Sequence, residues 1–280
     1  MTAIARNRGG AIALYGSVSV LSLAWLVPVA TAFMISVLPL DQTHNGWWNF
    51  HLGELTYRNY VRAWHEGLSS YVANSFVITI GAVALTLAAG LLASYAFVRL
   101  TFRLKHFSYF LLITTMIVPV QIILIPLLPW FRTLGFQSGP RQYLGIILVH
   151  AAFGAGWAVF MLSSFIADIP DELFEAAEVD GASQWDLFRR VVLRLSLPGI
   201  VSFAIIDFIF VWNDLLLALT LLDRDHQPLT VGLANLQSPH LAQEDIVSAG
   251  AMMAILPPLV LFAVLNRFYV RGLFAGGVKG

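Results

Sequence analysis

The stretch GLSSYVANSFVITIGAVALTLAAGLLASYAFV, residues 67–98, carries no formal charge over its whole length. About 20 apolar residues are enough for an α-helix to cross the hydrocarbon core of a bilayer, so this stretch exceeds one span. Its apolar residues are continuous rather than alternating, which favours a helix over the strands of a membrane barrel. The stretch therefore predicts an integral membrane protein built from helices.

The composition of the whole chain agrees with a membrane protein. Of its 280 residues, 58% are hydrophobic and 11% are charged, whereas about a quarter of the residues of an ordinary soluble domain are charged. Lys+Arg and Asp+Glu both number 16, so no net field points to nucleic acid. Cysteine is absent and the histidines show no metal-ligand spacing, so no metal site is predicted.

Six apolar stretches are long enough to cross a membrane, which predicts an all-α fold with six transmembrane helices. They are residues 9–40, 67–98, 107–131, 142–167, 195–222 and 246–266. The first stretch has a second interpretation as a cleaved signal peptide, because Arg6 and Arg8 precede it and residues 30–32 resemble a cleavage site. A signal core covers about 7–15 residues and this stretch continues well beyond that length, so a helix is expected.

Prolines are expected to distort two of these helices. Pro119, Pro126 and Pro129 would kink the third, and Pro257-Pro258 would break or bend the sixth. Each proline removes a backbone hydrogen bond and its ring collides with the preceding turn.

Lys and Arg are distributed unevenly between alternate loops. The inner set, if the N-terminus is cytoplasmic, is Arg6, Arg8, Arg99, Arg103, Lys105, Arg189, Arg190, Arg194, Arg267, Arg271 and Lys279. The outer set is Arg58, Arg62, Arg132, Arg141 and Arg224. Because basic residues concentrate on the cytoplasmic side, both termini are expected in the cytoplasm.

Polar residues inside the apolar stretches are candidates for function. Asp207 and Asp214 lie seven residues apart, which on a continuous helix places them about 10.5 Å apart along the axis and on roughly the same face. A charge at the centre of a membrane helix costs about 2.5–3.5 kcal/mol on insertion scales, so both face protein or water. For Asn213 and Asp214, a place in a translocation path and a bond to a neighbouring helix are equally open; for Asp207 the structural role is favoured. Asn74 also could face a cavity, although small polar residues often join membrane helices. His150 is expected to be packed rather than functional.

The inner segment 168–197 is too long for a simple turn between two spans. A first helix is predicted to begin at Pro170, which suits the first turn, and the acidic residues after it favour a helix N-terminus. Gly181 is placed to end this helix in a left-handed conformation. Ser183 and Asp186 have capping-box spacing and open a second helix.

The second helix carries an apolar stripe of Phe188, Val191, Val192 and Leu195. Such a helix pair could lie in the membrane interface or dock into a groove on a partner protein. Residues 168–188 contain seven acidic side chains and no basic one, which speaks against binding of the first helix to anionic lipid. A protein partner is therefore favoured.

The same segment resembles the EAA loop of ABC importer permeases. The resemblance rests on Glu175-Ala176-Ala177, Asp180-Gly181-Ala182, Phe188 and Leu197-Pro198. Trp212-Asn213-Asp214, Val231-Gly232-Leu233 and the run from Asn266 to Leu273 are similar to the maltose-type carbohydrate permeases. One departure is Arg194, where these permeases usually have proline.

The resemblance implies a type I ABC importer permease fold with a cytoplasmic EAA coupling loop. Residues 1–70 would form the N-terminal transmembrane helix and first outer loop, residues 71–271 a permease core of five helices, and residues 272–280 a cytoplasmic tail. The residues that would couple to the ATPase are Glu175, Ala176, Ala177, Asp180, Gly181, Ala182 and Phe188.

The implied protein is a non-catalytic, multi-pass subunit of the plasma membrane that imports a sugar or sugar-like solute. Neither Lys105 nor Lys279 stands before Ser or Thr as in a P-loop, so no cofactor is expected on this chain, and ATP and Mg²⁺ would bind separate ATPase subunits. The other implied partners are a second permease subunit forming a heterodimer, an extracytoplasmic binding protein and membrane lipid, with no nucleic acid.

Two other functions are open from the residues alone. A self-sufficient secondary transporter or channel could use Asp207 and Asp214, although it would leave the long inner loop without a role. A membrane scaffold could recruit a cytoplasmic protein through the same loop.

Overall fold

The computed structural model describes residues 8–43, 48, 52–236 and 243–277. Regular secondary structure in these residues is entirely helical, as the sequence predicts. Helices long and apolar enough to cross a membrane are Gly10–Ser36, Arg58–Arg99, Arg141–Ala167 and Glu244–Asn266. Two further bent helix pairs bring the number of spans to six if each pair is one span. The chain divides into two compact units, one of residues 1–68 and 233–255 and the other of residues 69–232 and 256–280.

The first unit begins with the long apolar helix α1 (Arg8–Ser36), which ends four residues before the predicted end at residue 40. Asn59 stabilises the C-terminal end of α1, because its Nδ2 donates hydrogen bonds to the carbonyls of Ser36 (3.0 Å) and Leu38 (2.8 Å). The hydroxyls of Ser36 and Tyr60 lie 2.7 Å apart. The short helices that follow α1 are α2 (Leu40–Thr43), η2 (Leu52–Glu54), α3 (Arg58–Ala63) and η3 (Trp64–Leu68).

The first part of helix α14 (Glu244–Gly277) completes this unit. Ala63 packs with Ile246 and Ala249 in a small buried cluster. Asp245 is almost fully buried, and its Oδ2 lies 3.4 Å from Nη1 of Arg62. The helix continues through Pro257 and Pro258 without a break. Of the two effects predicted for this pair, a break is therefore wrong, and a bend stays a prediction.

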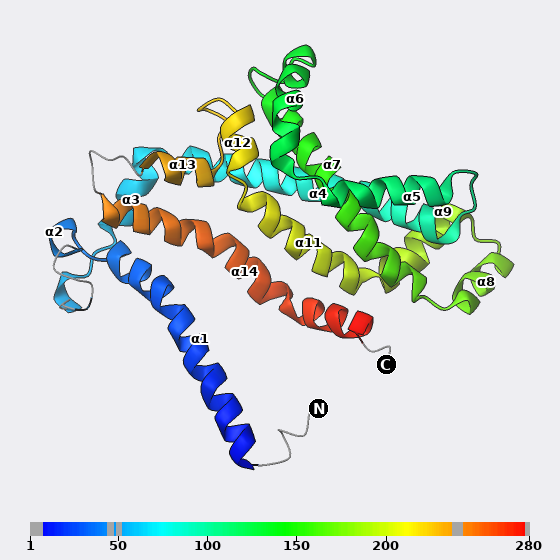
Figure 1. The fold of residues 1–280 in the computed structure, drawn as a ribbon, viewed down its shortest axis with the longest axis horizontal. Coiled ribbons are helices and arrows are strands. Elements are labelled where there is room, and N and C mark those ends of the chain that lie inside the picture. The colour runs from blue at the N-terminus through cyan, green and yellow to red at the C-terminus, as the bar shows by residue number, and fades with distance from the viewer. Residues whose placement is uncertain (1–7, 44–47, 49–51, 237–242, 278–280) are drawn as a thin grey trace. The chain divides into compact units, whose positions relative to one another are not determined.

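The second unit is built around helices α4 (Ser69–Arg99) and α7 (Arg141–Ala167), which pack along much of their length (Figure 1). Small residues allow this close approach, as is common between membrane helices. A Cβ atom added at Gly90 would lie 2.4 Å from the Cβ of Ala158. Helix α11 (Leu197–Trp212) packs against both α4 and α7.

The third apolar stretch is a broken helix rather than the single kinked span expected over 107–131. Helix α5 (Lys105–Thr114) and the 3₁₀ turn η4 (Thr115–Ile117) precede α6 (Val120–Thr133), and the axis turns by 104° between them (Figure 1). The break falls at Val118 and Pro119, because a residue before proline prefers an extended backbone and proline cannot donate a hydrogen bond. Pro126 and Pro129 both lie inside α6.

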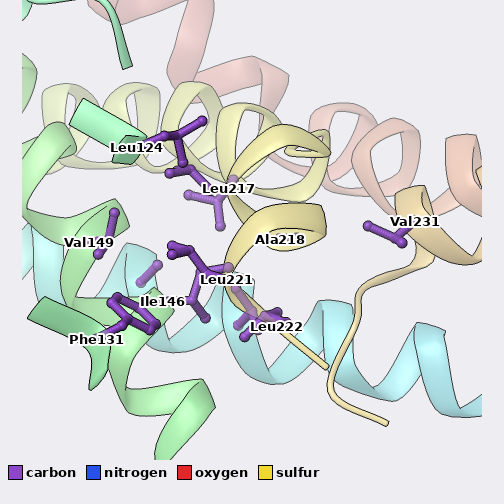
Figure 2. Close-up of a cluster of buried hydrophobic side chains, with 12 residues drawn as sticks. Leu124, Phe131, Ile146, Val149, Leu217, Ala218, Leu221, Leu222 and Val231 are labelled. Atoms are coloured by element: carbon purple, nitrogen blue, oxygen red, sulfur yellow. The ribbon is translucent and has the colours of Figure 1, made fainter. Parts of the chain in front are cut away.

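A buried apolar cluster holds α6 and α7 against helix α12 (Leu216–Leu221). Leu217 of α12 lies beside Leu124 of α6, and Leu221 projects towards Phe131 of α6 and Ile146 of α7 (Figure 2). Leucine and phenylalanine side chains in such clusters exclude water and lipid from the helix contacts, so this cluster fixes the place of α12 within the unit.

Candidate functional site

The loop between α7 and α11 contains the predicted helix pair. The first helix is α8 (Asp171–Val179), and Pro170 stands just before it with an extended backbone rather than in its first turn. Gly181 has φ +81°, and the N–H groups of Gly181 and Ala182 donate to the carbonyls of Glu178 (3.0 Å) and Ala177 (2.9 Å). These two bonds form a Schellman motif, so the predicted left-handed end at Gly181 is confirmed.

The second helix runs through α9 (Gln184–Asp186), η5 (Leu187–Val192) and α10 (Leu193–Leu195). Its predicted capping box is confirmed: the N–H of Asp186 donates to Oγ of Ser183 (3.2 Å), and the N–H of Ser183 donates to Oδ2 of Asp186 (3.3 Å). Arg194 lies exposed in α10, so the second helix forms with arginine at this position. The axis bends by 73° before α11.

The apolar stripe of the second helix is only partly as predicted. Phe188 and Val192 are buried, but Leu195 is 49% exposed and Leu187 is buried in addition. The reason is that η5 is a π-helical segment, whose wider turn shifts the register of the residues that follow it.

The loop is attached to the end of α4 through both of its helices. Tyr95 donates a hydrogen bond from its hydroxyl to Oε1 of Gln184 (2.7 Å), and its ring lies 5.5 Å from that of Phe188. The guanidinium of Arg99 lies 3.7 Å from the ring centroid of Phe174 and also pairs with Asp171. Both loop helices therefore contact the end of α4.

The predicted coupling residues divide between two sides of the loop. Glu175, Ala176, Asp180 and Gly181 are exposed, whereas Phe188 is buried. Ala177 and Ala182 are half-buried and pack on the same apolar cluster as Phe188.

Three exposed apolar side chains accompany the acidic ones on α8 and α9 and were not predicted. They are Leu173, Val179 and Trp185. Acidic and apolar groups side by side on a surface are typical of a binding site for a protein, since a solvated surface rarely gathers large apolar side chains. We name the exposed residues Leu173, Glu175, Ala176, Val179, Asp180, Gly181 and Trp185 the loop surface.

The fifth apolar stretch is broken where sequence analysis placed the candidate path residues. Helix α11 ends at Trp212, and Asp214 accepts hydrogen bonds from the N–H groups of Leu217 (3.2 Å) and Ala218 (3.0 Å) at the start of α12. The prediction that Asp207 and Asp214 share one continuous helix is therefore wrong. An aspartate that caps a new helix competes with continuation of the old one.

His150 of α7 lies beside this break. Its Nε2 is 3.7 Å from Oδ2 of Asp214, too far for a hydrogen bond, and has no hydrogen-bond partner within the described residues. Asn213 is exposed and donates from Nδ2 to the carbonyl of Ile209 (2.8 Å). The break therefore brings together an amide, a carboxylate and an imidazole with unused hydrogen-bonding capacity.

Asp207 lies deeper in the helix packing. Its side chain is 7% exposed, and a Cβ added at Gly154 of α7 would come within 3.2 Å of its Oδ1 and 2.7 Å of the methyl group of Thr86. Residues of α4 and α7 thus lie close to this carboxyl group of α11. This position agrees with the role favoured from the sequence, in which Asp207 helps to hold neighbouring helices together.

Asn74 is placed apart from the break. Its Nδ2 donates to the carbonyls of Asp225 and Gln227, both at 2.9 Å, and its Oδ1 accepts a hydrogen bond from the hydroxyl of Tyr143 (2.6 Å). All of its polar groups are thereby engaged in fastening the segment after α12 to α4 and α7. A role of Asn74 in a translocation path stays a prediction.

A second polar cluster, which sequence analysis missed, fastens the same segment. Gln142 is fully buried; it donates from Nε2 to Oδ2 of Asp223 (2.6 Å) and accepts at Oε1 from the Asp223 N–H (2.8 Å). Nδ1 of His226 lies 2.6 Å from Oδ1 of Asp223. Partial burial raises the pKa of Asp223, but the hydrogen bonds from His226 and Gln142 lower it more, so the pKa lies below its ordinary value.

These features define a multi-span helical membrane component with a paired-helix loop between α7 and α11. Residues 85–274 match the family described as binding-protein-dependent transport system inner membrane component. The chain is 34% identical over 277 residues to the osmoprotective compounds uptake permease protein of Synechocystis sp., covering 94% of this chain and 91% of that protein. It is 33% identical over 260 residues to the trehalose transport system permease protein of Mycobacterium tuberculosis, covering 91% and 93%.

The fold is similar to that in the crystal structure of a bacterial ABC transporter involved in the import of the acidic polysaccharide alginate. The TM-score is 0.80 at 20% sequence identity, covering 94% of this chain and 97% of that one. The chain belongs to the family of inner membrane components of binding-protein-dependent transport systems. It is accordingly a non-catalytic, multi-pass permease subunit of an ABC importer.

Proposed function

We propose that this chain forms one half of the membrane pathway of a sugar importer and that a separate ATPase drives it by alternating access. The observation that carries the proposal is the two-sided loop between α7 and α11. Its inner side, with Phe188 and Phe174, packs against Tyr95 and Arg99 of α4. The loop surface defined above is exposed and can bind a partner protein.

The loop acts as a lever in this mechanism. Closure of the ATPase on nucleotide displaces α8 and the second helix together, because the Schellman turn at Gly181 fixes the angle between them. Tyr95 and Arg99 carry the displacement into α4, and through it into the packed helices α7 and α11. Nucleotide and cargo must each bind the inward-open and outward-open states with different affinity for this cycle to be driven.

The complete transporter in this proposal contains four kinds of protein. ATP and Mg²⁺ bind the ATPase subunits, a second and different permease subunit supplies the other half of the path, and an extracytoplasmic binding protein delivers the cargo. The uneven distribution of Lys and Arg supports a cytoplasmic location for both termini of this chain. The loop surface then faces the ATPase.

Sugar as the cargo is supported by the relatives named for trehalose and for alginate. Asn213 and Asp214 are the proposed path residues, and His150 joins them because its Nε2 lies beside the Asp214 carboxylate. Amide, carboxylate and imidazole groups donate to and accept from the hydroxyl groups of a sugar. Membership of a binding-protein-dependent family favours this importer over a self-sufficient transporter and over a scaffold.

The test is sugar uptake by the reconstituted transporter. This chain, its ATPase and the second permease are reconstituted in liposomes together with the binding protein. Uptake of labelled trehalose and other α-glucosides is then measured with ATP, or a non-hydrolysable analogue, on the side of the membrane where the ATPase lies. The proposal requires uptake that depends on hydrolysis and on the binding protein. Uptake by this chain alone along a proton or sodium gradient would overturn it.

A further inference from the structure

A groove of about 560 Å³ opens at the junction of α4, α5 and α7. Its walls are largely apolar and include Phe97, Tyr109, Phe160 and Met161. The volume falls within the range of small-molecule sites, about 300–1,000 Å³. Phe160 is 54% exposed, so the groove is open along the outer surface of α7.

One end of the groove is basic. Lys105 and His106, the first two residues of α5, both line it, and none of its lining residues is acidic. Lys105 donates one hydrogen bond from Nζ to the carbonyl of Leu100 (3.0 Å), and its ammonium group has two further N–H donors. Arg103 is exposed two residues earlier.

A second observation within the groove points to a polar ligand group. Ser163 is one of the lining residues, and its hydroxyl oxygen, which is buried, has no hydrogen-bond partner among the described residues. A buried polar atom without a partner costs free energy, so such atoms are normally satisfied by a ligand, water or protein. The hydroxyl of the neighbouring Ser164 is already bonded to the carbonyl of Met161 (2.7 Å).

We propose that this groove binds an anionic phospholipid. The phosphate lies at Lys105 and His106, and the upper part of an acyl chain lies along Phe97, Phe160 and Met161. Basic pockets between membrane helices attract anionic headgroups in this way. An apolar wall with the Lys105 ammonium at one end matches a molecule with an apolar chain and a phosphate at one end, whereas a soluble anion would leave the aromatic walls uncovered.

The position of the groove gives the lipid a means to affect transport. Its walls include Val98 and Ala167, which lie next to Arg99 of the loop attachment and to the start of the 168–197 segment. A lipid in the groove therefore braces the α4 and α7 ends to which the loop is attached. The assignment of the basic end of the groove to the cytoplasmic leaflet rests on the proposed orientation of the chain. The existence of the groove does not depend on that orientation.

The probe is a photoactivatable phosphatidylglycerol, compared with the phosphatidylcholine analogue of the same chain length. Each is incorporated with the complete transporter into nanodiscs, and cross-linked peptides are mapped by mass spectrometry. We expect phosphatidylglycerol to label the α5 and α7 walls in preference to phosphatidylcholine. Lys105→Gln should reduce this preference about fivefold, the value for one basic residue near an anionic headgroup, and Lys105→Arg should retain it.

Arg132→Gln is the control, since it removes one positive charge at the end of α6, outside the groove lining. The headgroup comparison in the unmodified transporter tests the proposal even if a Lys105 variant fails to fold. Equal labelling by the two lipids would overturn the anion site. Labelling of neither, with protein cross-links at these walls instead, would show that a second subunit covers the groove. Sugar uptake and its ATP dependence are scored in parallel, so failure of the lipid site is distinguishable from failure of the importer assignment.

Discussion

Replacing Gly181 by valine tests whether the turn between the loop helices transmits the ATPase movement. Gly181 has φ +81°, and a Cβ added there would meet no atom within 4 Å. The cost is therefore confined to the backbone, about 1–2 kcal/mol for a residue held in the left-handed conformation. A change of one or two kcal/mol alters a conformational equilibrium by a factor of about 5–30.

We expect this cost to act locally, since Phe174 and Phe188 keep both helices on the buried cluster. The ATPase should still co-purify with the Gly181→Val transporter, and the thermal unfolding temperature should change little. Sugar uptake per ATP hydrolysed in proteoliposomes should fall several-fold, because the two helices no longer move as one unit.

Two variants control for strain and for side-chain size. Gly139 also has positive φ (+58°) and no atom within 4 Å of an added Cβ, but it lies beyond the opposite end of α7; Gly139→Val should leave uptake per ATP unchanged. Gly181→Asn should be milder than valine, since asparagine tolerates the left-handed region. Equal loss in Gly139→Val and Gly181→Val, or normal coupling in Gly181→Val, would refute this reasoning.

Three further predictions concern the helix packing and the segment after α12. Asn74→Ala removes three hydrogen bonds, two to the carbonyls of Asp225 and Gln227 and one from the Tyr143 hydroxyl. We therefore expect a loss of about 1–3 kcal/mol in stability and a lower unfolding temperature by differential scanning fluorimetry, whereas Asn213→Ala should be close to neutral. Equal unfolding temperatures would contradict the fastening role. Gly90→Leu should prevent close packing of α4 on α7, seen as loss of monodisperse protein in size-exclusion chromatography, with partial recovery in combination with Ala158→Gly; unaltered elution of Gly90→Leu would argue against the contact. The pKa of Asp223 is lowered in the folded protein, so the stability that its ionised form contributes is present above the ordinary value of 3.8 and is lost as the pH falls through the lower folded value. The amide hydrogen-exchange rates of residues 223–228, corrected for the intrinsic rate, should accordingly be constant between about pH 7 and 5 and rise only below about pH 4. A rise in these rates above pH 5 would show that another group controls the stability of the segment.

The loop was predictable because its signals are local. Gly181 supplies the left-handed end and Ser183 the cap, and both act on backbone groups within a few residues of themselves. The side of the second helix that is buried was less predictable, since the π-helical turn in η5 depends on how Phe188 packs on Tyr95, a residue far away in the sequence.

The breaks in the third and fifth spans show a different limit. Apolar length alone cannot distinguish one straight span from two helices at an angle, because both bury the same side chains in lipid or protein. The signals were present: Pro119 disfavours helix at the residue before it, and Asn213-Asp214 before an apolar run is typical of a helix start. The proximity of His150 to Asp214 carried no local signal, because His150 lies on α7 and Asp214 lies between α11 and α12.

The most direct test of the account is a cross-link between the loop surface and the ATPase. The chain contains no cysteine, so Ala176→Cys introduces a single reactive site on the exposed side of α8. In the complete transporter, a thiol-linked photoreactive probe at position 176 should label the ATPase, with a yield that changes on adding ATP, whereas the same probe at exposed Leu134 after α6 should not label it. Labelling from position 134, or none from position 176 in a complex that still contains the ATPase, would contradict the assignment of this loop as the coupling element.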